Sequence, residues 1–261
     1  MKAAPPAPSL AAPLPSLPMP TLSIVIPALN EETCLGRTLR QLSVLDPPPL
    51  EVLVVDGGSS DATTAIAAEA GATVLHAAVQ GRAAQMNAGA ARARGELLCF
   101  LHADTLVPDD LVAVTAQVLN DPAVAAAGFV SLMGGDTSTR WLISALNAAK
   151  TSLAPLLFRP HLFLRGLRLL FGDQVMVMRR SSFERCGGFN AELPLLEDGD
   201  LCLRLVKLGR IRLIQRVVIS SDRRVRRWGP WKATALYLWI GVLWGLGVSP
   251  RSLRRLYPDV R

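Results

Sequence analysis

The sequence predicts an α/β fold with a mostly parallel central sheet flanked by helices. Through residue 101, short apolar runs typical of strands alternate with amphipathic stretches typical of helices. This alternation favours a parallel sheet whose faces are covered by helices. The 261 residues, half of them hydrophobic and 19% charged, suffice for one such domain with a small appendage, and they exclude a chain that is disordered throughout.

Runs of β-branched and apolar residues predict four strands, at 22–27, 50–55, 73–76 and 96–101. The run at 50–55 is apolar almost throughout, as in a strand buried on both faces. Amphipathic stretches predict three helices, at 30–45, 62–70 and 83–94. Asn30 is expected to cap the first helix, whose first turn would hold two acidic residues. The less regular second half predicts a strand at 175–178 and helices at 181–186 and 197–208.

Polar clusters follow three of these strands: Asn30-Glu31-Glu32, Asp56-Gly-Gly-Ser-Ser-Asp61 and His102-Ala-Asp104. Ligands of open α/β sheets bind outside the carboxyl ends of the strands, so the clusters together predict a site. Asp56 is placed to accept hydrogen bonds from a nucleobase or ribose. Asp61 fits such a ligand-binding role and a helix cap equally well. Neither a dinucleotide-binding fingerprint nor a phosphate-binding P-loop occurs.

Three further groups of residues have both a chemical and a structural interpretation. Asp104 is placed to hold a divalent metal, Mg²⁺ or Mn²⁺, that bridges a diphosphate, and it also fits an ordinary turn. Glu197 and Asp198 open a helix, where one could act as a general base, and where both would also stabilise the helix N-terminus. The clustered Arg and Trp residues at 223–228 suit a diphosphate or a basic face near a membrane.

Taken in order, these segments resemble family 2 glycosyltransferases of the GT-A fold, over residues 21–228. The segments that carry the resemblance are 23–32, 54–61, 81–89, 102–104, 197–198 and 227–228. The resemblance implies a Rossmann-like sheet, a nucleotide-sugar donor that is UDP-linked by default, and inversion at the transferred sugar. It implies an enzyme that uses a divalent metal.

The resemblance also implies roles for individual residues. Those expected at the nucleotide and donor are Pro27, Asn30, Glu32, Asp56, Arg82, Asn87, His102, Arg227 and Trp228. Asp104 matches the more important metal ligand of the family's Asp-x-Asp motif, whose first Asp is His102 here. Asp198, beside Glu197, matches the usual catalytic base. The Gln of the family's Gln-x-x-Arg-Trp motif is Arg224, so long-chain processive synthesis is not supported.

Four segments are similar to a family 2 subgroup called transferase 2, rSAM/selenodomain-associated: 100–105, 171–174, 187–189 and 196–198. Some members of that subgroup are described as arsenosugar-biosynthesis glycosyltransferases. In that interpretation Asp173 and Gln174 face the acceptor, and a cap on a buried strand is the structural alternative. The acceptor itself is not identified by these residues.

Residues 233–248 are almost wholly apolar, with Lys232 before them and Arg251 after them. They are fewer than the roughly 20 that a spanning helix needs, so we expect a helix at the membrane interface, with a helix packed on the domain as the alternative. The basic, leucine-rich stretch at 153–171 favours a membrane surface and a lipophilic acceptor. The expected organisation is a disordered extension at 1–20, a transferase domain at 21–228 and a membrane-associated helix with a basic tail at 229–261.

The formal net charge of +7 suits a phosphorylated substrate, an anionic lipid or a nucleic acid. Aromatic residues make up only 5% of the chain and no nucleic-acid-binding motif occurs, so no nucleic-acid partner is expected. The four cysteines form no CxxC pair and are interpreted as reduced thiols. We therefore expect a protein of the cytoplasm, or one bound peripherally to the cytoplasmic face of the plasma membrane.

Two other functions compete with this interpretation. A haloacid-dehalogenase-type phosphatase needs an Asp-x-Asp motif after its first strand, whereas here the motif follows the fourth strand and begins with His102. A catalytically inactive GT-A domain that only binds nucleotide or membrane is the second alternative. His102 favours that alternative, and the acidic pair Glu197 and Asp198 opposes it.

Overall fold

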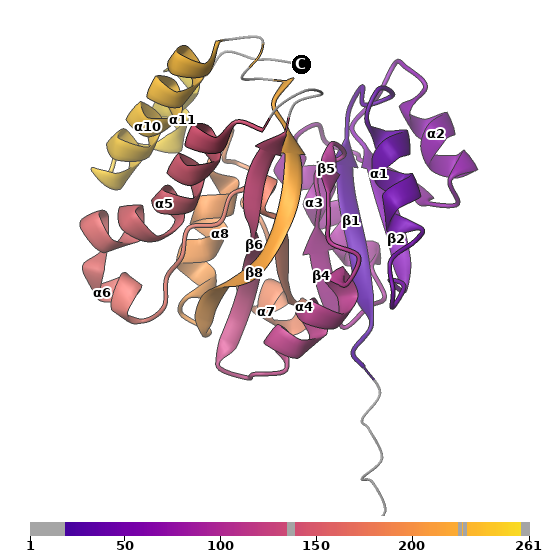
Figure 1. Cartoon of the computed structure of the whole chain (residues 1–261), viewed down its shortest axis with the longest axis horizontal. Coiled ribbons are helices and arrows are strands. Elements are labelled where there is room, and N and C mark those ends of the chain that lie inside the picture. Colours follow the sequence, from indigo (N-terminus) through magenta and orange to yellow (C-terminus); the bar gives the residue numbers. More distant parts are fainter. Residues whose placement is uncertain (1–18, 135–138, 224–225, 227–228, 257–261) are drawn as a thin grey trace, which may run out of the picture.

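The computed structural model describes residues 19–134, 139–223, 226 and 229–256 (Figure 1). One eight-stranded sheet forms its centre, in the order β3-β2-β1-β4-β7-β6-β8-β5. The strands are β1 (Leu22–Ala28), β2 (Glu51–Asp56), β3 (Thr73–His76), β4 (Leu97–Phe100), β5 (Thr105–Leu106), β6 (Val124–Gly134), β7 (Met176–Arg179) and β8 (Arg210–Ser221). The α/β architecture predicted from the alternation of patterns is confirmed.

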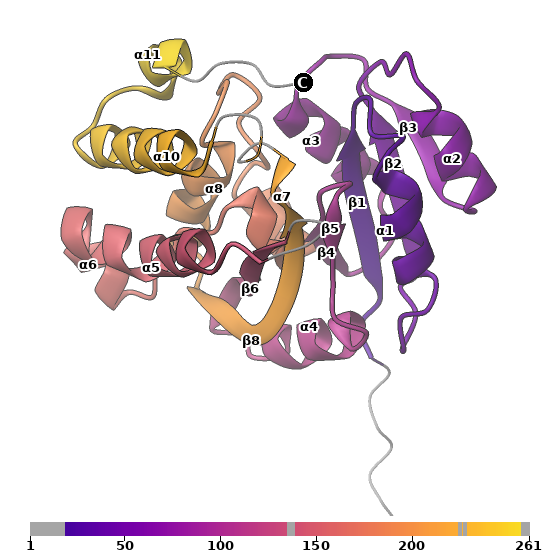
Figure 2. The ribbon, with the colours of Figure 1, turned by 45° about the horizontal axis from the view of Figure 1, so that its top comes forward.

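Helices cover both faces of this sheet. On one face lie α1 (Leu35–Leu42), α2 (Thr63–Glu69) and α4 (Leu111–Leu119). On the other lie α3 (Arg82–Arg92), α7 (Arg180–Arg185) and α8 (Glu197–Leu205). The remaining helices gather at the end of the molecule far from α2, as Figures 1 and 2 show: α5 (Trp141–Phe158), α6 (Pro160–Leu164), α10 (Pro230–Gly245) and α11 (Pro250–Leu253).

The strand β2 is buried on both faces, as its apolar run predicted. Val54 packs in the core under α1 and α2, and Leu53 and Val55 pack in the core under α3. The parallel neighbours β1 and β4 are buried in the same way, with Ile24 and Leu98 fully inaccessible to solvent. Because these three strands run parallel, their polar carboxyl-end loops meet at one edge of the sheet.

The sheet is mixed, so the prediction of a mostly parallel sheet is wrong for the second half of the chain. Four strand pairs are parallel, but β7 runs antiparallel to both β4 and β6, and β5 runs antiparallel to β8. After α6 the chain returns to the carboxyl edge of the sheet and forms the short 3₁₀ helix η1 (Gly172–Gln174). β7 therefore starts at that edge and must run in the opposite direction.

Two local predictions also need correction. Asn30 does not cap the first helix, because α1 begins only at Leu35 and Asn30 has a left-handed backbone with φ 54°. The Asn30 amide oxygen instead accepts a hydrogen bond from the Ser60 N–H at 2.9 Å. The patterns also predicted none of α4, α5, β6 and β8, although these four elements build much of the second half.

The C-terminal helix α10 packs along α5 and against α8. The ring of Phe158 lies 2.6 Å from where a Cβ of Gly245 would stand, so only glycine allows this approach of the two helices. Trp244 similarly fills the space beside Gly199 of α8. None of the described helices has the length and apolar character needed to cross a membrane.

Replacing Gly89 by Ala should destabilise the fold, because α3 approaches the sheet most closely there. A Cβ at Gly89 would overlap the Val25 side chain and approach Val55 Cγ2 to 3.0 Å. Overpacking of this kind lowers the free energy of unfolding by about 1–3 kcal/mol, measurable by chemical denaturation. Gly241→Ala in α10 is the control, since its Cβ meets nothing within 4 Å and should be neutral or slightly stabilising. Equal effects of the two changes would contradict this account of the packing.

Candidate active site at the carboxyl edge of the sheet

The loops that follow β1 and β2 are joined by hydrogen bonds into one rigid wall. The Asn30 N–H donates to the Ser59 hydroxyl at 3.0 Å, and the Glu31 N–H donates to the Thr63 hydroxyl at 2.8 Å. Glu32 accepts a hydrogen bond from the Ala62 N–H at 3.1 Å. The polar side chains predicted at these two strand ends therefore lie together, although much of the binding capacity of Asn30 and Glu32 is used within the wall.

Asp56 ends β2 and is almost fully buried. Its carboxylate accepts hydrogen bonds from the Gly58 N–H at 3.0 Å and from the Ser59 N–H at 3.1 Å. Burial alone would raise the pKa of Asp56, but these bonds and the Ser59 hydroxyl outweigh it and hold the pKa below its usual value. Asp56 is therefore a fixed anion at the base of the wall, beside the partly buried Pro27.

Arg82, in the first turn of α3, binds the acidic pair at the start of α8, a helix on the same face of the sheet. Its Nε donates to Glu197 Oε1 at 2.5 Å, and its Nη2 lies 3.5 Å from Asp198 Oδ2. Its Nη1 lies 3.4 Å from His102 Nε2, just beyond β4. The structure thus brings together four of the residues predicted from separate parts of the sequence.

Asp198 is buried and differs from Glu197 in its surroundings. Its Oδ2 accepts a hydrogen bond from the Gly172 N–H at 2.9 Å. Burial raises the pKa of Asp198 to about 7; the Arg82 cation opposes this shift, and the neighbouring Glu197 and Asp173 carboxylates reinforce it. Both acids lie in the first turn of α8, so they stabilise the helix terminus as well as forming the site.

Gly172 allows its backbone to approach this cluster. A Cβ at Gly172 would overlap the imidazole ring of His102 and come within 3.3 Å of Asp198 Oδ2. The His102 ring and the Gly172 N–H therefore flank the same carboxylate. Sequence patterns had indicated the segment 171–174 only as an acceptor-facing loop or strand cap, without this bond.

A second charged cluster consists of Arg223, Glu31 and Asp104 and lies just beyond the ends of β1 and β4. Arg223 Nη2 bridges two carboxylates, lying 2.7 Å from Glu31 Oε2 and 3.0 Å from Asp104 Oδ2. Burial acts to lower the pKa of Arg223, but Asp104 and Glu31 raise it well above its usual range. Sequence reasoning placed Glu31 in a polar cluster at a strand end and Arg223 among the clustered Arg residues, but it gave neither residue an individual role.

Gln174 and Asp173, the two residues predicted near the acceptor, differ in their contacts. Gln174 is buried, and its amide oxygen accepts bonds from the Thr151 hydroxyl and the Phe171 N–H, both at 3.1 Å, so it has the structural role left open above. Asp173 accepts a hydrogen bond from Asn147 Nδ2 at 3.2 Å. Burial raises the pKa of Asp173 despite the opposing charge of Lys150.

Asn87 also makes a structural contact. Its amide exchanges two hydrogen bonds with the backbone of Phe189, at 2.8 and 2.9 Å, and so ties α3 to the turn before α8. Arg227 and Trp228 lie outside the described residues. The observed contacts of Asn87 therefore hold the backbone of two elements beside the site together. The part of the chain that the structure describes does not test the predicted roles of Arg227 and Trp228.

Comparison with known families identifies the domain. Residues 23–187, more than half of the chain, match the model of glycosyl transferase family 2. The chain belongs to glycosyl transferase family 2. The family 2 domain holds every strand-end cluster described above, together with Arg82 and Gly172.

Two curated relatives are longer proteins than this chain. The chain is 28% identical over 188 residues to the beta-monoglucosyldiacylglycerol synthase of Trichormus variabilis, which covers 68% of this chain and 39% of the relative. It is 30% identical over 222 residues to the pre-mycofactocin glycosyltransferase of Mycobacterium tuberculosis, covering 80% of this chain and 43% of the relative. The chain thus spans about two fifths of the length of these relatives.

Solved structures share the fold at low sequence identity. A mannosyltransferase from Pyrobaculum calidifontis in complex with GDP-Man and Mn²⁺ has a TM-score of 0.69 at 20% identity, covering 98% of this chain and 69% of that one. Glucosyl-3-phosphoglycerate synthase from M. tuberculosis, in complex with Mn²⁺, UDP and phosphoglyceric acid, has a TM-score of 0.61 at 20% identity, covering 88% and 79%. The family 2 domain therefore has a GT-A-like fold.

The family 2 fold implies a divalent metal, and two carboxylates of this domain fit one. Within the described residues, no group of three or more His, Cys, Asp or Glu side chains could hold an ion. Asp104 and Glu31 nevertheless converge on a single positive nitrogen of Arg223. Mg²⁺-type sites commonly use one or two carboxylates and complete their shell with substrate phosphates and water. Asp104, with Glu31 beside it, has the donor chemistry of such a site once Arg223 has moved away.

Replacing Arg223 by Met should strengthen Mn²⁺ binding to the nucleotide-free protein. The guanidinium and the metal compete for the same carboxylate oxygens, so removing the cation should raise the affinity by about tenfold, which corresponds to the 1–2 kcal/mol of one charged hydrogen bond. Isothermal titration calorimetry measures this affinity directly.

Arg216→Met is a matched control, because Arg216 makes a comparable surface ion pair with Asp110 at 3.0 Å, away from the site. This control should leave Mn²⁺ affinity unchanged. The double variant Arg223→Met with Asp104→Asn should lose the gain. An unchanged affinity in Arg223→Met would show that the bridge does not compete with the ion.

Proposed function

We propose that this chain is an inverting glycosyltransferase that moves a sugar from a nucleoside-diphosphate sugar to an acceptor hydroxyl. The observation that carries the proposal is the Asp198 carboxylate, which is buried at the carboxyl edge of the sheet with a pKa of about 7. A general base works best when its pKa lies near the working pH. Family membership supplies the reaction class, and Asp198 supplies the group that the reaction needs.

In the proposed reaction Asp198 takes the proton of the acceptor hydroxyl. The acceptor oxygen forms a bond to the anomeric carbon, the bond to the diphosphate oxygen breaks, and the nucleoside diphosphate leaves with the electron pair. Because only one displacement occurs, the anomeric configuration inverts. A metal held at Asp104 would neutralise the developing charge of the leaving group when bound. Arg82 holds Glu197 and Asp198 in position and lies close to the departing phosphates in this scheme.

The donor is proposed to lie along the wall formed after β1 and β2. Asp56 would bind the nucleoside, in company with Pro27, Asn30 and Glu32, and His102 would face the sugar or the phosphates. Arg227 and Trp228 are proposed at the diphosphate. We propose a UDP-sugar as the default donor, although one of the similar solved structures holds GDP-Man.

The acceptor is proposed to enter beside Asp173 and Asn147, on the side of Asp198 facing α5. The resemblance of 100–105 and 171–174 to the rSAM/selenodomain-associated subgroup points to a small or lipophilic acceptor. One relative is by name a beta-monoglucosyldiacylglycerol synthase, and so makes a glycosylated lipid. We propose a lipophilic acceptor and a peripheral position at a membrane surface, on its cytoplasmic side.

A catalytically inactive domain that only binds nucleotide is the second candidate. His102 at the first position of the Asp-x-Asp motif favours it, and so does Arg223 on the Asp104 carboxylate. Turnover of a nucleotide sugar with and without Mn²⁺ separates the two candidates, because only the transferase consumes donor.

The first experiment is a donor screen by thermal unfolding. UDP, GDP and their common sugar conjugates are added with and without Mn²⁺, and a ligand that binds the folded state raises Tm. We expect one nucleotide to stabilise the protein in a metal-dependent manner. Asp104→Ala should abolish the metal-dependent part.

Asp110→Ala serves as the control for this screen, since Asp110 pairs with Arg216 on the surface and should leave the response intact. A well-folded protein that no nucleotide stabilises would overturn the transferase proposal. Stabilisation that persists in Asp104→Ala would place the metal elsewhere.

The second experiment measures kcat/KM against pH. A base must be deprotonated to act, and the pKa of Asp198 is raised to about 7 by burial. Activity should therefore fall about tenfold per pH unit below pH 7 and level off above it. Asp198→Asn should lower kcat by about 10²–10⁴.

The matched control for the base is Asp200→Asn. Asp200 lies in the same helix turn but pairs with Arg204 at 2.6 Å, and its loss should leave the pH profile in place. A profile that is flat through pH 7, or an Asp198→Asn variant with wild-type kcat, would contradict the assignment of the base.

A further inference from the structure

Large apolar side chains are exposed on three neighbouring helices at one end of the molecule. On α5 and α6 they include Trp141, Leu157 and Leu164, on α10 they include Trp231 and Trp239, and Leu246 directly follows α10. Leu157 is 72% exposed, Leu164 84% and Trp231 77%. Figure 2 shows α10 lying along α5 with α6 beside them, and we call this surface the α5–α6–α10 face. An exposed apolar surface of this kind marks an interaction site.

The two segments that contain these helices and the loops beside them are basic and hold no acidic residue. Residues 137–172 and 223–258, which contain α5, α6, α10 and α11, hold 13 of the 28 Lys and Arg residues and none of the 21 Asp and Glu residues. The rest of the chain is consequently net negative, with 15 basic residues against 21 acidic ones. The exposed basic side chains among them are Lys232 in α10, Arg165 just after α6, and Arg251 and Arg255 in the helical turns after α10, so an apolar and anionic partner suits this end of the molecule.

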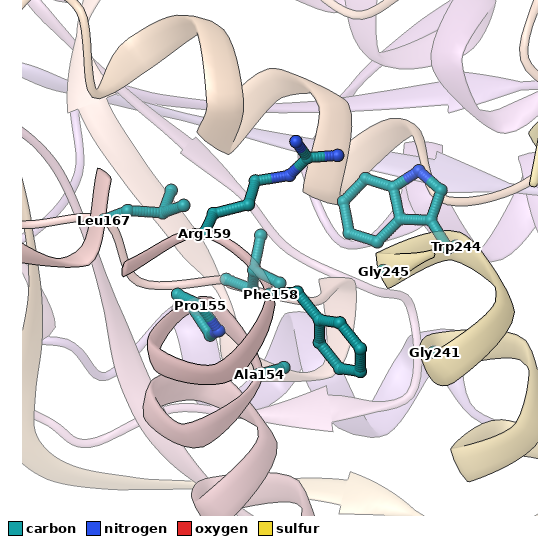
Figure 3. Close-up of a pocket in the computed structure, with 9 residues that line it drawn as sticks. Ala154, Pro155, Phe158, Arg159, Leu167, Gly241, Trp244 and Gly245 are labelled. Carbon is teal, nitrogen blue, oxygen red and sulfur yellow. The ribbon is translucent and has the colours of Figure 1, made fainter. Parts of the chain in front are cut away.

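The face is firmly attached to the catalytic domain. Phe158 packs against Gly245, and Trp244 packs against Gly199, which directly follows Asp198 in α8. The crevice that remains between α5 and α10 is only about 20 Å³. Figure 3 shows Phe158, Arg159 and Trp244 among the residues that line it. That volume holds about one water molecule, so the partner must lie on the outer surface rather than inside the crevice.

The composition of the face matches the interface of a lipid bilayer. Trp side chains favour the boundary between headgroups and acyl chains, and Arg and Lys favour anionic headgroups. Helices that lie in the interface combine apolar and basic side chains in this way. None of the described helices could span the bilayer, which agrees with binding at its surface.

We propose that the α5–α6–α10 face docks on an anionic lipid bilayer, with its Leu and Trp side chains at the acyl boundary and with Lys232 and the flanking Arg165 and Arg255 among the headgroups. The purpose of this docking rests on the proposed function, since docking would present the site to an acceptor that resides in the membrane. Trp244 is the direct link, because it belongs to α10 and packs against Gly199, the residue that follows Asp198.

Sedimentation with vesicles tests the proposal on the full chain. Wild type should pellet with vesicles that contain phosphatidylglycerol, pellet weakly with pure phosphatidylcholine, and be released by high salt. Leu157→Asp with Leu164→Asp should weaken binding by tenfold or more, because each buried Leu contributes about tenfold. Arg165→Glu with Arg255→Glu should weaken binding to the anionic vesicles only.

Val44→Asp and Arg37→Glu are the matched controls, since both residues are exposed on the far side of the molecule, at α1. Both controls should bind like wild type. Wild type that ignores anionic vesicles, or face variants that bind as tightly as the controls, would overturn the proposal. Self-association in size-exclusion chromatography that the Leu variants abolish, without vesicle binding, would assign the face to a second copy of the chain and also overturn it.

The docking test is independent of catalysis. The face variants should keep the stabilisation by nucleotide and Mn²⁺, because no residue of the site is changed. Loss of vesicle binding with nucleotide binding intact would confirm docking through this face. Nucleotide binding without any vesicle binding by wild type would refute docking and leave the proposed transferase function standing.

Discussion

The site depends on the guanidinium of Arg82, which lies between two buried carboxylates. Glu197 and Asp198 are almost fully buried, and removing two such charges from water costs several kcal/mol each unless a partner compensates. Arg82 comes from α3 under the first half of the sheet, whereas the acids come from α8 under the second half. The compensation exists only when both halves are assembled, so the charge pair ties the formation of the site to completion of the fold.

The unequal sharing of this one cation explains why the two acids differ. Arg82 binds Glu197 closely and reaches Asp198 only at 3.5 Å, so Asp198 keeps much of the penalty of its burial. The Gly172 N–H supplies a single further hydrogen bond, and Glu197 and Asp173 add repulsion. A carboxylate in these surroundings holds its proton to higher pH than an ordinary one. The same arrangement that completes the fold thereby poises Asp198 between its two protonation states.

The first half of the fold was predictable because β1, β2 and β4 are largely buried and their sequences are apolar runs. The second half was not, for reasons visible in two strands. β8 has a register shift between Ile214 and Val217, where Gln215 and Arg216 interrupt its alternation, and β6 begins with small Ala residues that signal no particular element. The roles of individual polar side chains were also ambiguous from the sequence. Asn87 and Gln174 bind buried backbone, and residue type alone does not distinguish this from binding a ligand.

The contacts that sequence reasoning missed join residues far apart in the chain. Arg223 meets Glu31 across 192 positions and Asp104 across 119, and no local pattern contains that information. What the sequence did show was the order of the motifs, which placed Asp56 and Asp104 at strand ends and Asp198 at the start of a helix. The geometry then added the hydrogen-bond and ion-pair partners of these acids.

The distribution of charge connects the site with the α5–α6–α10 face. The second acid-free stretch begins at Arg223, whose guanidinium lies on the Asp104 and Glu31 carboxylates, and it continues into the basic C-terminal helices. One segment thus brings a cation into the negatively charged edge of the sheet and brings further cations to the outer surface. The acids of the sheet edge can attract a metal or hold Arg223, and phosphates arriving there would attract Arg223 away from them. The same segment also forms α10 of the docking face. A membrane that binds the outer cations of this segment would therefore act on the same stretch of chain whose Arg223 neutralises the Asp104 and Glu31 carboxylates.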